Sequence, residues 1–389
     1  MALRRPHRKS RHGCVECKRR RVKCDETRPS CSNCEKRHTE CEYGSSTSLL
    51  WTNEESEGGL DFARSSSAAT DSGMTASTDN TPSLNVHDLE LMMQWCNSTF
   101  HTLSRNQHTD PIWRNLVPEE ALSHPFLMHG ILALSALHLA RTGPEPSRRT
   151  SYLNRAVAHQ NQALALFRGL LGDINEENAK AIFAFAGIVV IYTFGFPNTP
   201  GVQDPWASVD DIYQVLVLTR GTQQVIYTPR NFREFLSNSS FGPILQVEEV
   251  AGILPDEAVA ALRKLRAANE ACGKDANHEL HIYSEVIQNL QEMLTWVYGG
   301  MRANTIAGRW AIKLPARFME LLREREPLAL VMLAHYGVLL RCLQHSWCFD
   351  EWCTRVANVV WAILDAQWRP LVHWPMNELL GTNYHEDVI

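Results

Sequence analysis

The stretch CVECKRRRVKCDETRPSCSNCEKRHTEC, residues 14–41, decides how the N-terminal part of the chain folds. One pattern occurs twice in it, with two and then six residues between successive cysteines. The six cysteines are Cys14, Cys17, Cys24, Cys31, Cys34 and Cys41. Two zinc ions need eight coordination positions, so six thiolates suffice only if two sulfurs bridge both ions. The repeat predicts that the bridging sulfurs belong to Cys14 and Cys31, the first cysteine of each half.

Metal binding is expected to supply most of the folding free energy of this segment. Residues 14–43 contain three large apolar side chains, Val15, Val22 and Tyr43, which are too few for a self-sufficient core. Zinc can replace such a core, because the metal binds the folded chain in preference to the unfolded one. We therefore predict two Zn²⁺ ions held by the six cysteines.

A basic run lies between the second and third cysteines. It consists of Lys18, Arg19, Arg20, Arg21 and Lys23. With its cysteine spacing, the segment CKRRRVKCDETRPSC (17–31) resembles the fungal zinc-cluster (Zn2Cys6) transcription factors. The resemblance implies a binuclear zinc site and a DNA-binding module whose first short helix enters the major groove, usually at a CGG-type triplet.

The same resemblance implies roles for the basic residues. It places Arg20 and Arg21 on bases, and Lys18, Arg19 and Lys23 on phosphates. Arginine suits guanine because its planar fork matches the O6 and N7 acceptors of that base.

Charge is distributed unevenly along the chain. The net charge of the whole chain is -5, which alone would argue against a nucleic-acid partner. Residues 1–43, however, hold 13 Lys and Arg against 6 Asp and Glu, while the remainder holds 25 against 37. A basic module on an acidic body is typical of a tethered DNA reader, and we expect double-stranded promoter DNA as its partner.

The cysteine-rich segment admits two other interpretations. A disulfide framework would suit a secreted protein, but residues 1–10 carry four basic residues and no apolar stretch of a signal peptide. The basic run could also be a solvated face or a nuclear import signal, and import can share the same charges. We expect a nuclear protein, with shuttling from the cytoplasm left open.

The rest of the chain divides by composition. We expect a basic arm at 1–13, the zinc module at 14–43, a disordered Ser/Thr/Gly-rich linker at 44–83, a helical domain at 84–380 and a tail at 381–389. The linker shows no sustained heptad repeat, so a homodimer would have to form through the helical domain.

Apolar residues recur at helical spacing after residue 84, and no series of alternating strand patterns occurs, so the fold class is mainly α. A stripe of Leu89, Met92, Met93, Cys96, Phe100 and Leu103 is predicted to be buried. Ser208 and Asp211 predict the start of a helix that ends near Gly221. Further helices are expected over 124–140, 152–171, 181–196, 257–272, 279–298, 328–344 and 351–368. The run at 181–196 has 16 residues, too few to span a bilayer, so no membrane segment is expected.

The helical part also resembles the regulatory domain of sterol-uptake-control-type fungal regulators. The resemblance is carried by HDLELMMQWCNSTFHTLS (87–104), IWRNLVP (112–118), HPFLMHGILALSALHLA (124–140), MLAHYGVLLRCLQHSWC (332–348) and Trp374-Pro375-Met376. It implies a helical fold with a hydrophobic pocket, which in the sterol-sensing members holds ergosterol. Many relatives with this domain instead control secondary-metabolite gene clusters.

Catalysis has no support in the sequence. No P-loop, dinucleotide-binding, nucleophile-elbow or zinc-protease motif occurs. Cys342, His345, Cys348 and Cys353 could suggest a second metal site, but their aromatic and leucine neighbours favour thiols that act as small core residues.

We therefore expect a sequence-specific regulator of RNA polymerase II transcription, specific to one pathway such as a secondary-metabolite gene cluster. Its further partners would be the transcription machinery or coactivators. The alternatives are a sterol-responsive regulator with an apolar, sterol-like ligand in the helical domain, and a ligand-binding or interaction scaffold with weak DNA specificity.

Overall fold

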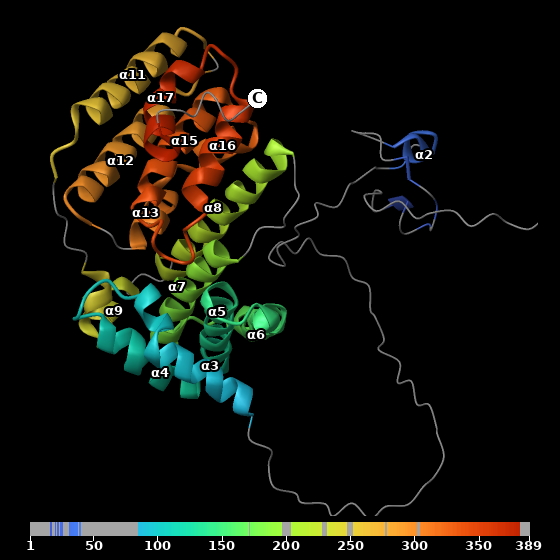
Figure 1. The fold of residues 1–389 in the computed structure, drawn as a ribbon, viewed down its shortest axis with the longest axis vertical. Helices are drawn as coiled ribbons and strands as arrows, with labels where there is room; N and C mark the ends of the chain where they lie inside the picture. Colours follow the sequence, from blue (N-terminus) through green and yellow to red (C-terminus); the bar gives the residue numbers. More distant parts are fainter. Residues whose placement is uncertain are drawn as a thin grey trace, which may run out of the picture. The chain divides into compact units, whose positions relative to one another are not determined.

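The computed structural model describes residues 16, 17, 20, 22, 24, 25, 31–37, 39, 85–170, 172–196, 204–227, 232–246, 252–276, 278–301 and 304–381. The chain forms two compact units, Met1–Asn80 and Thr81–Ile389. Every regular element in the described residues is helical, which confirms the mainly α fold class (Figure 1). The expected arm at 1–13, the expected linker at 44–83 and residues 382–389 of the expected tail lie outside these residues.

Sulfur atoms form the buried centre of the N-terminal unit. Cys17, Cys24, Cys31 and Cys34 are each at most 2% exposed and cluster together. The short helix α2 (Ser32–Glu35) begins directly after Cys31. Both carboxylate oxygens of Asp25 accept the backbone N–H of Ser32 at 3.2 Å, and the Ser32 hydroxyl also donates to Asp25. This contact ties the end of the first cysteine repeat to the start of the second.

The second unit, the body, is built from helices throughout its described residues. The longer ones are α3 (Val86–Asn97), α5 (Pro125–Thr142), α6 (Arg149–Arg168), α7 (Ala179–Gly195), α8 (Pro205–Tyr227), α11 (Asp256–Cys272), α12 (Leu280–Tyr298), α15 (Pro327–Arg341) and α16 (Trp352–Ile363). The shorter ones are α4 (Val117–Ser123), α9 (Phe232–Asn238), α10 (Gly242–Leu245), α13 (Thr305–Lys313), α14 (Ala316–Arg323) and α17 (His373–Leu380). Three 3₁₀ helices, η1 (Thr99–Thr102), η3 (Pro146–Arg148) and η4 (Arg369–Leu371), and a π-helix, η2 (Ile112–Leu116), join them.

Two groups of helices make up the body, and α7 and α8 connect them (Figure 1). In the first group, α5 packs against α3, α4, α6 and α7. In the second, α15 packs against α12, α13, α16 and α17. Helix α8 contacts α7 at one end of this arrangement and α13, α14 and α16 in the second group. Helices α5, α7 and α15 are apolar on nearly every side, so each must be buried among other helices.

Several predicted helices are confirmed. The apolar runs at 124–140 and 181–196 form α5 and α7, and both are largely buried. The expected helices at 257–272 and 279–298 correspond to α11 and α12 within one residue at each end. No described helix combines the length and the apolar character that crossing a membrane requires.

The predicted buried stripe is right for Phe100 on η1, which is 3% exposed, but wrong for the face of α3 that packs. The helix buries Leu91 and Trp95, whereas Leu89 is 46% and Met93 is 65% exposed. Both faces of α3 carry apolar residues, so their spacing alone could not identify the face that packs. The tertiary structure selects the face with Trp95, whose indole N–H donates to the carbonyl of Trp113 at 2.9 Å.

The predicted limits of α8 are also wrong. Ser208 is buried inside the helix, which begins at Pro205 and continues past Gly221 to Tyr227. The capping oxygen comes from Asp204, whose Oδ1 accepts the backbone N–H of Trp206 at 3.0 Å. Asp, Ser and Thr can all cap a helix, so the motif at 208–211 resembles a cap although it lies inside α8.

Candidate metal centre

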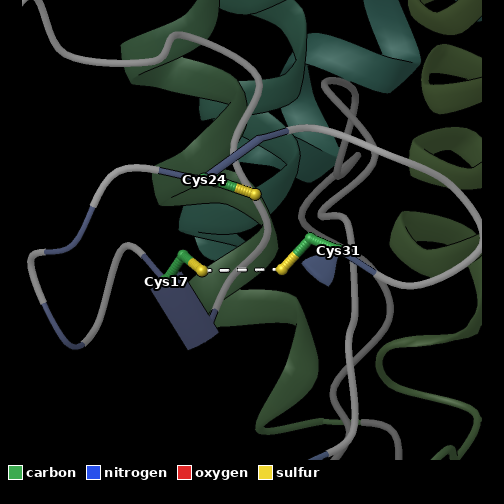
Figure 2. Close-up of side chains that lie close together, drawn as sticks. All are labelled: Cys17, Cys24 and Cys31. Atoms are coloured by element: carbon green, nitrogen blue, oxygen red, sulfur yellow. Dashed lines mark hydrogen bonds between the residues drawn. The ribbon is translucent and has the colours of Figure 1, made fainter. Parts of the chain in front are cut away.

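Three cysteine sulfurs converge in the N-terminal unit. The Sγ atoms of Cys17, Cys24 and Cys31 lie within 4.8 Å of one another, and all three side chains are buried (Figure 2). The Sγ atoms of Cys17 and Cys31 are 3.6 Å apart. Two thiolates on one tetrahedral zinc ion, each about 2.3 Å from the metal, lie about 3.8 Å from each other. The observed spacing therefore fits two ligands of one zinc ion.

A disulfide framework is excluded among the described cysteines. Cys17, Cys24, Cys31 and Cys34 form no disulfide. A covalent S–S bond would be about 2.05 Å long, far below the separation of Cys17 and Cys31. Buried thiols gathered in this way are a soft donor set, which is the chemistry that zinc prefers.

Local backbone hydrogen bonds position these sulfurs. Glu16 and Cys17 are helical, and the N–H of Arg20 donates to the carbonyl of Glu16 at 3.1 Å. The N–H of Val22 donates to the carbonyl of Cys17 at 3.1 Å, which turns the chain back toward Cys24. In the second half, the N–H of Cys34 donates to the carbonyl of Cys31 at 2.9 Å. Cys31 and Cys34 therefore lie on one turn.

Arg20 is engaged inside the module. Its Nη2 donates to the sulfur of Cys34 at 3.7 Å, and its Nε lies 3.1 Å from Oε1 of Glu16. The Arg20 side chain is 22% exposed. Glu16 and Arg20 are four residues apart, a spacing that can predict an ion pair on a helix from the sequence alone. No pattern in the sequence predicts the contact between Arg20 and Cys34.

The remaining predicted site residues lie outside the described part of the chain. They are the metal ligands Cys14 and Cys41, and the DNA-contacting residues Lys18, Arg19, Arg21 and Lys23. Their roles as metal ligands and DNA contacts therefore stay predictions.

Two cysteines of the body are core residues, and the other three are half-buried. Cys348 and Cys353 are buried, and burial raises the pKa of the Cys348 thiol to about 12. A thiol that stays protonated is a poor metal ligand. Cys342 donates from Sγ to the carbonyl of Leu339 at 2.8 Å. Within the described residues, the cluster of Cys17, Cys24 and Cys31 is the one group of three or more His, Cys, Asp or Glu side chains whose ligand atoms lie this close together.

A cavity of about 450 Å³ lies in the body beside the 3₁₀ helix η1. Its lining residues are mostly polar. They are His101, Thr102, Ser104, Asn304, Cys342, Leu343, His345 and Ser346. Several of these polar groups already bond within the protein: the Thr102 hydroxyl accepts the indole N–H of Trp347, and the side-chain amide of Asn304 donates to the Thr102 carbonyl. The lining therefore does not identify a class of ligand.

Two family descriptions match parts of the chain. Residues 12–49 match the fungal Zn(2)-Cys(6) binuclear cluster domain, and residues 90–199 match the fungal specific transcription factor domain.

Relatives with these features are found in several fungi. A Zn(2)-C6 fungal-type transcription factor of Gibberella zeae is 24% identical over an alignment that covers 100% of this chain and 89% of the relative. Sterol uptake control protein 2 of Saccharomyces cerevisiae is 36% identical over 109 residues, 28% of this chain and 11% of the relative. The protein of the same name from Candida albicans is 35% identical over 124 residues, 31% of this chain and 16% of the relative. The matches to these two proteins thus span a small part of their length.

Proposed function

We propose that the chain is a fungal Zn(2)-Cys(6) transcription factor that binds promoter DNA in the nucleus and regulates transcription by RNA polymerase II, which its two domain matches and its relative from Gibberella zeae support. The observation that carries the proposal is the convergence of the Cys17, Cys24 and Cys31 sulfurs within 4.8 Å, next to a basic run. Zinc at this position would hold the basic residues on a rigid turn, which is the requirement for reading base edges.

Two zinc ions would share the six cysteines. Cys14, Cys17, Cys24 and Cys31 would hold the first ion, and Cys14, Cys31, Cys34 and Cys41 the second. The arrangement of the described sulfurs supports this division, because Cys31 groups with Cys17 and Cys24 while Cys34 stands outside that group. Cys31 is also the residue from which α2 begins, so it can face both halves.

Arg21 would make the principal base contact, at a guanine of a CGG-like element. Arg20 remains a candidate for the base edges, but its contacts with Glu16 and Cys34 support a positioning role. Lys18, Arg19 and Lys23 would contact phosphates. A bidentate arginine on guanine is the commonest specific contact in the major groove.

The helical body would serve as the regulatory part, contacting the transcription machinery or coactivators and forming any homodimer. A role specific to one pathway, such as a secondary-metabolite gene cluster, is the main proposal. The names of two relatives support a sterol-responsive regulator as the alternative. Thermal unfolding of the full chain with and without ergosterol separates these two, because a ligand bound to the native state raises Tm.

Selection of random DNA duplexes with the full, zinc-loaded chain tests the main proposal. A short G/C-containing element should be enriched, and the Cys31→Ser variant should enrich none. The variant is a matched control because its body is unchanged. Selection that enriches no element with the zinc-loaded chain would reject sequence-specific DNA binding.

A further inference from the structure

A pair of histidines on α5 and α6 lies outside everything assigned to the cysteine cluster. Nδ1 of His129 lies 3.0 Å from Nδ1 of His159, and the ring centroids are 5.2 Å apart. Helices α5 and α6 pack against each other, so the pair joins two packed elements of the body. Both side chains are partly buried.

A carboxylate supports the second histidine from its other side. Nε2 of His159 lies 3.4 Å from Oδ1 of Asp88 on α3. A histidine that binds a metal through one nitrogen typically donates its other N–H to a carboxylate or carbonyl, which fixes the tautomer and the ring orientation. With the proton of His159 on Nε2 and directed at Asp88, its Nδ1 carries a lone pair that faces His129.

We propose that His129 and His159 bind one divalent transition-metal ion of the kind that prefers imidazole nitrogen, such as Zn²⁺ or Cu²⁺. Two imidazoles on one tetrahedral zinc ion, each about 2.0–2.1 Å from the metal, have their nitrogens about 3.3 Å apart. The observed 3.0 Å therefore requires the two nitrogens to separate by a few tenths of an ångström, which small ring rotations supply.

The protonation states are compatible with metal binding. Burial lowers the pKa of both imidazoles, so both are neutral near pH 7, the form that binds metals. Without metal, the Nδ1–H of His129 donates to Nδ1 of His159. With metal, the proton of His129 moves to its Nε2 through solvent, so no net proton is released from the pair.

The metal ion at this site would exchange readily with ions in solution. In the described part of the body, no third His, Cys, Asp or Glu completes a group of close ligand atoms here, so water would fill the remaining positions. Arg155 raises the local positive potential and Asp88 opposes it. The bound ion would fasten α6 to α5 and, through Asp88, to α3.

Native mass spectrometry of the full chain, equilibrated with zinc, counts the bound ions. We expect the wild-type chain and the control His281→Gln, at an exposed histidine on α12, to hold one ion more than His129→Gln and His159→Gln. Equal ion counts in all four chains would overturn the proposal. A wild-type chain that holds only the ions lost on Cys31→Ser substitution would also overturn it, independently of how the histidine variants fold.

The Asp88→Asn variant tests the supporting carboxylate. It should keep the extra ion but bind it about 10–100-fold more weakly in a competition titration with a chelator. Zinc affinity equal to that of the wild-type chain would contradict the role of Asp88.

Discussion

The sulfur of Cys17 lies 3.6 Å from the sulfur of Cys31, so the two halves of the cysteine repeat meet at their ligand atoms. Cys24 joins this pair, whereas the equally buried Cys34 lies outside the group. The arrangement makes Cys31 the described residue best placed to serve both proposed ions. Its substitution should therefore have different consequences from that of its neighbour on α2.

Replacing Cys31 by Ser should remove most of the zinc of the N-terminal module, because a bridging sulfur holds both ions. Replacing Cys34 by Ser should leave about one ion, since a terminal ligand serves only one. Metal analysis of the purified full-length variants measures this difference. Equal losses from the two variants would contradict the bridging role of Cys31.

Substitutions in the basic run should separate base reading from positioning. Arg21→Ala should reduce discrimination at one base pair by about 1–3 kcal/mol, because a bidentate contact with guanine is lost. Arg20→Ala should instead weaken zinc retention, since the Arg20 guanidinium donates to the Cys34 sulfur. Competition binding with single-base variants of the selected element measures the first effect, and zinc release to a chelator measures the second.

Lys23→Ala is the matched control for Arg21→Ala. It should weaken binding to all duplexes alike and reduce the slope of log K against log salt by about 0.9, as expected for one lost phosphate contact. If Arg21→Ala produced the same uniform loss, the assignment of Arg21 to a base would be wrong.

Two leucines on α3 should differ in their contribution to stability. Leu91 is fully buried, so Leu91→Ala should lower the free energy of unfolding by about 2–5 kcal/mol. Leu89 is 46% exposed, so Leu89→Ala should change the free energy of unfolding by no more than about 0.5 kcal/mol. Urea unfolding of both variants, followed by far-UV circular dichroism, measures the difference. A larger loss for Leu89→Ala would restore the opposite face of α3 as the buried one.

Acid should destabilise the body through His335. This side chain is fully buried, and burial lowers its pKa from 6.5 to about 4 although its Nδ1–H donates to the carbonyl of Val331 at 2.9 Å. The unfolded chain binds this proton below pH 6.5, whereas the folded chain binds it only near pH 4. Stability is therefore unaffected above pH 6.5 and falls between pH 6.5 and 4, by about 2 kcal/mol at pH 5.

His335→Gln removes this titration. The loss of unfolding free energy between pH 7 and pH 5, measured by urea unfolding, should be about 2 kcal/mol smaller in the variant than in the wild-type chain. An equal loss in both proteins would show that His335 does not cause the acid sensitivity. Carboxylates that titrate in the same range contribute equally to both chains and cancel in the comparison.

Much of the body could be predicted because long apolar runs have few alternatives. The runs at 124–140 and 181–196 become α5 and α7, since a helix that is apolar all round must lie inside a protein. Boundaries were harder to predict. The capping motif at Ser208 competes with Asp204, and local sequence does not distinguish two acceptable caps.

The sequence by itself predicted the metal chemistry proposed for this protein, because the number and spacing of the cysteines limit how many ions six thiolates can serve. It also determined the helical class, since the apolar period of a helix is a local property. Only the tertiary structure decided which face of α3 is buried, that Arg20 reaches the sulfur of Cys34, and that His129 meets His159. Each of these depends on which distant segments pack together, and the order of residues within one helix carries no information about its neighbour.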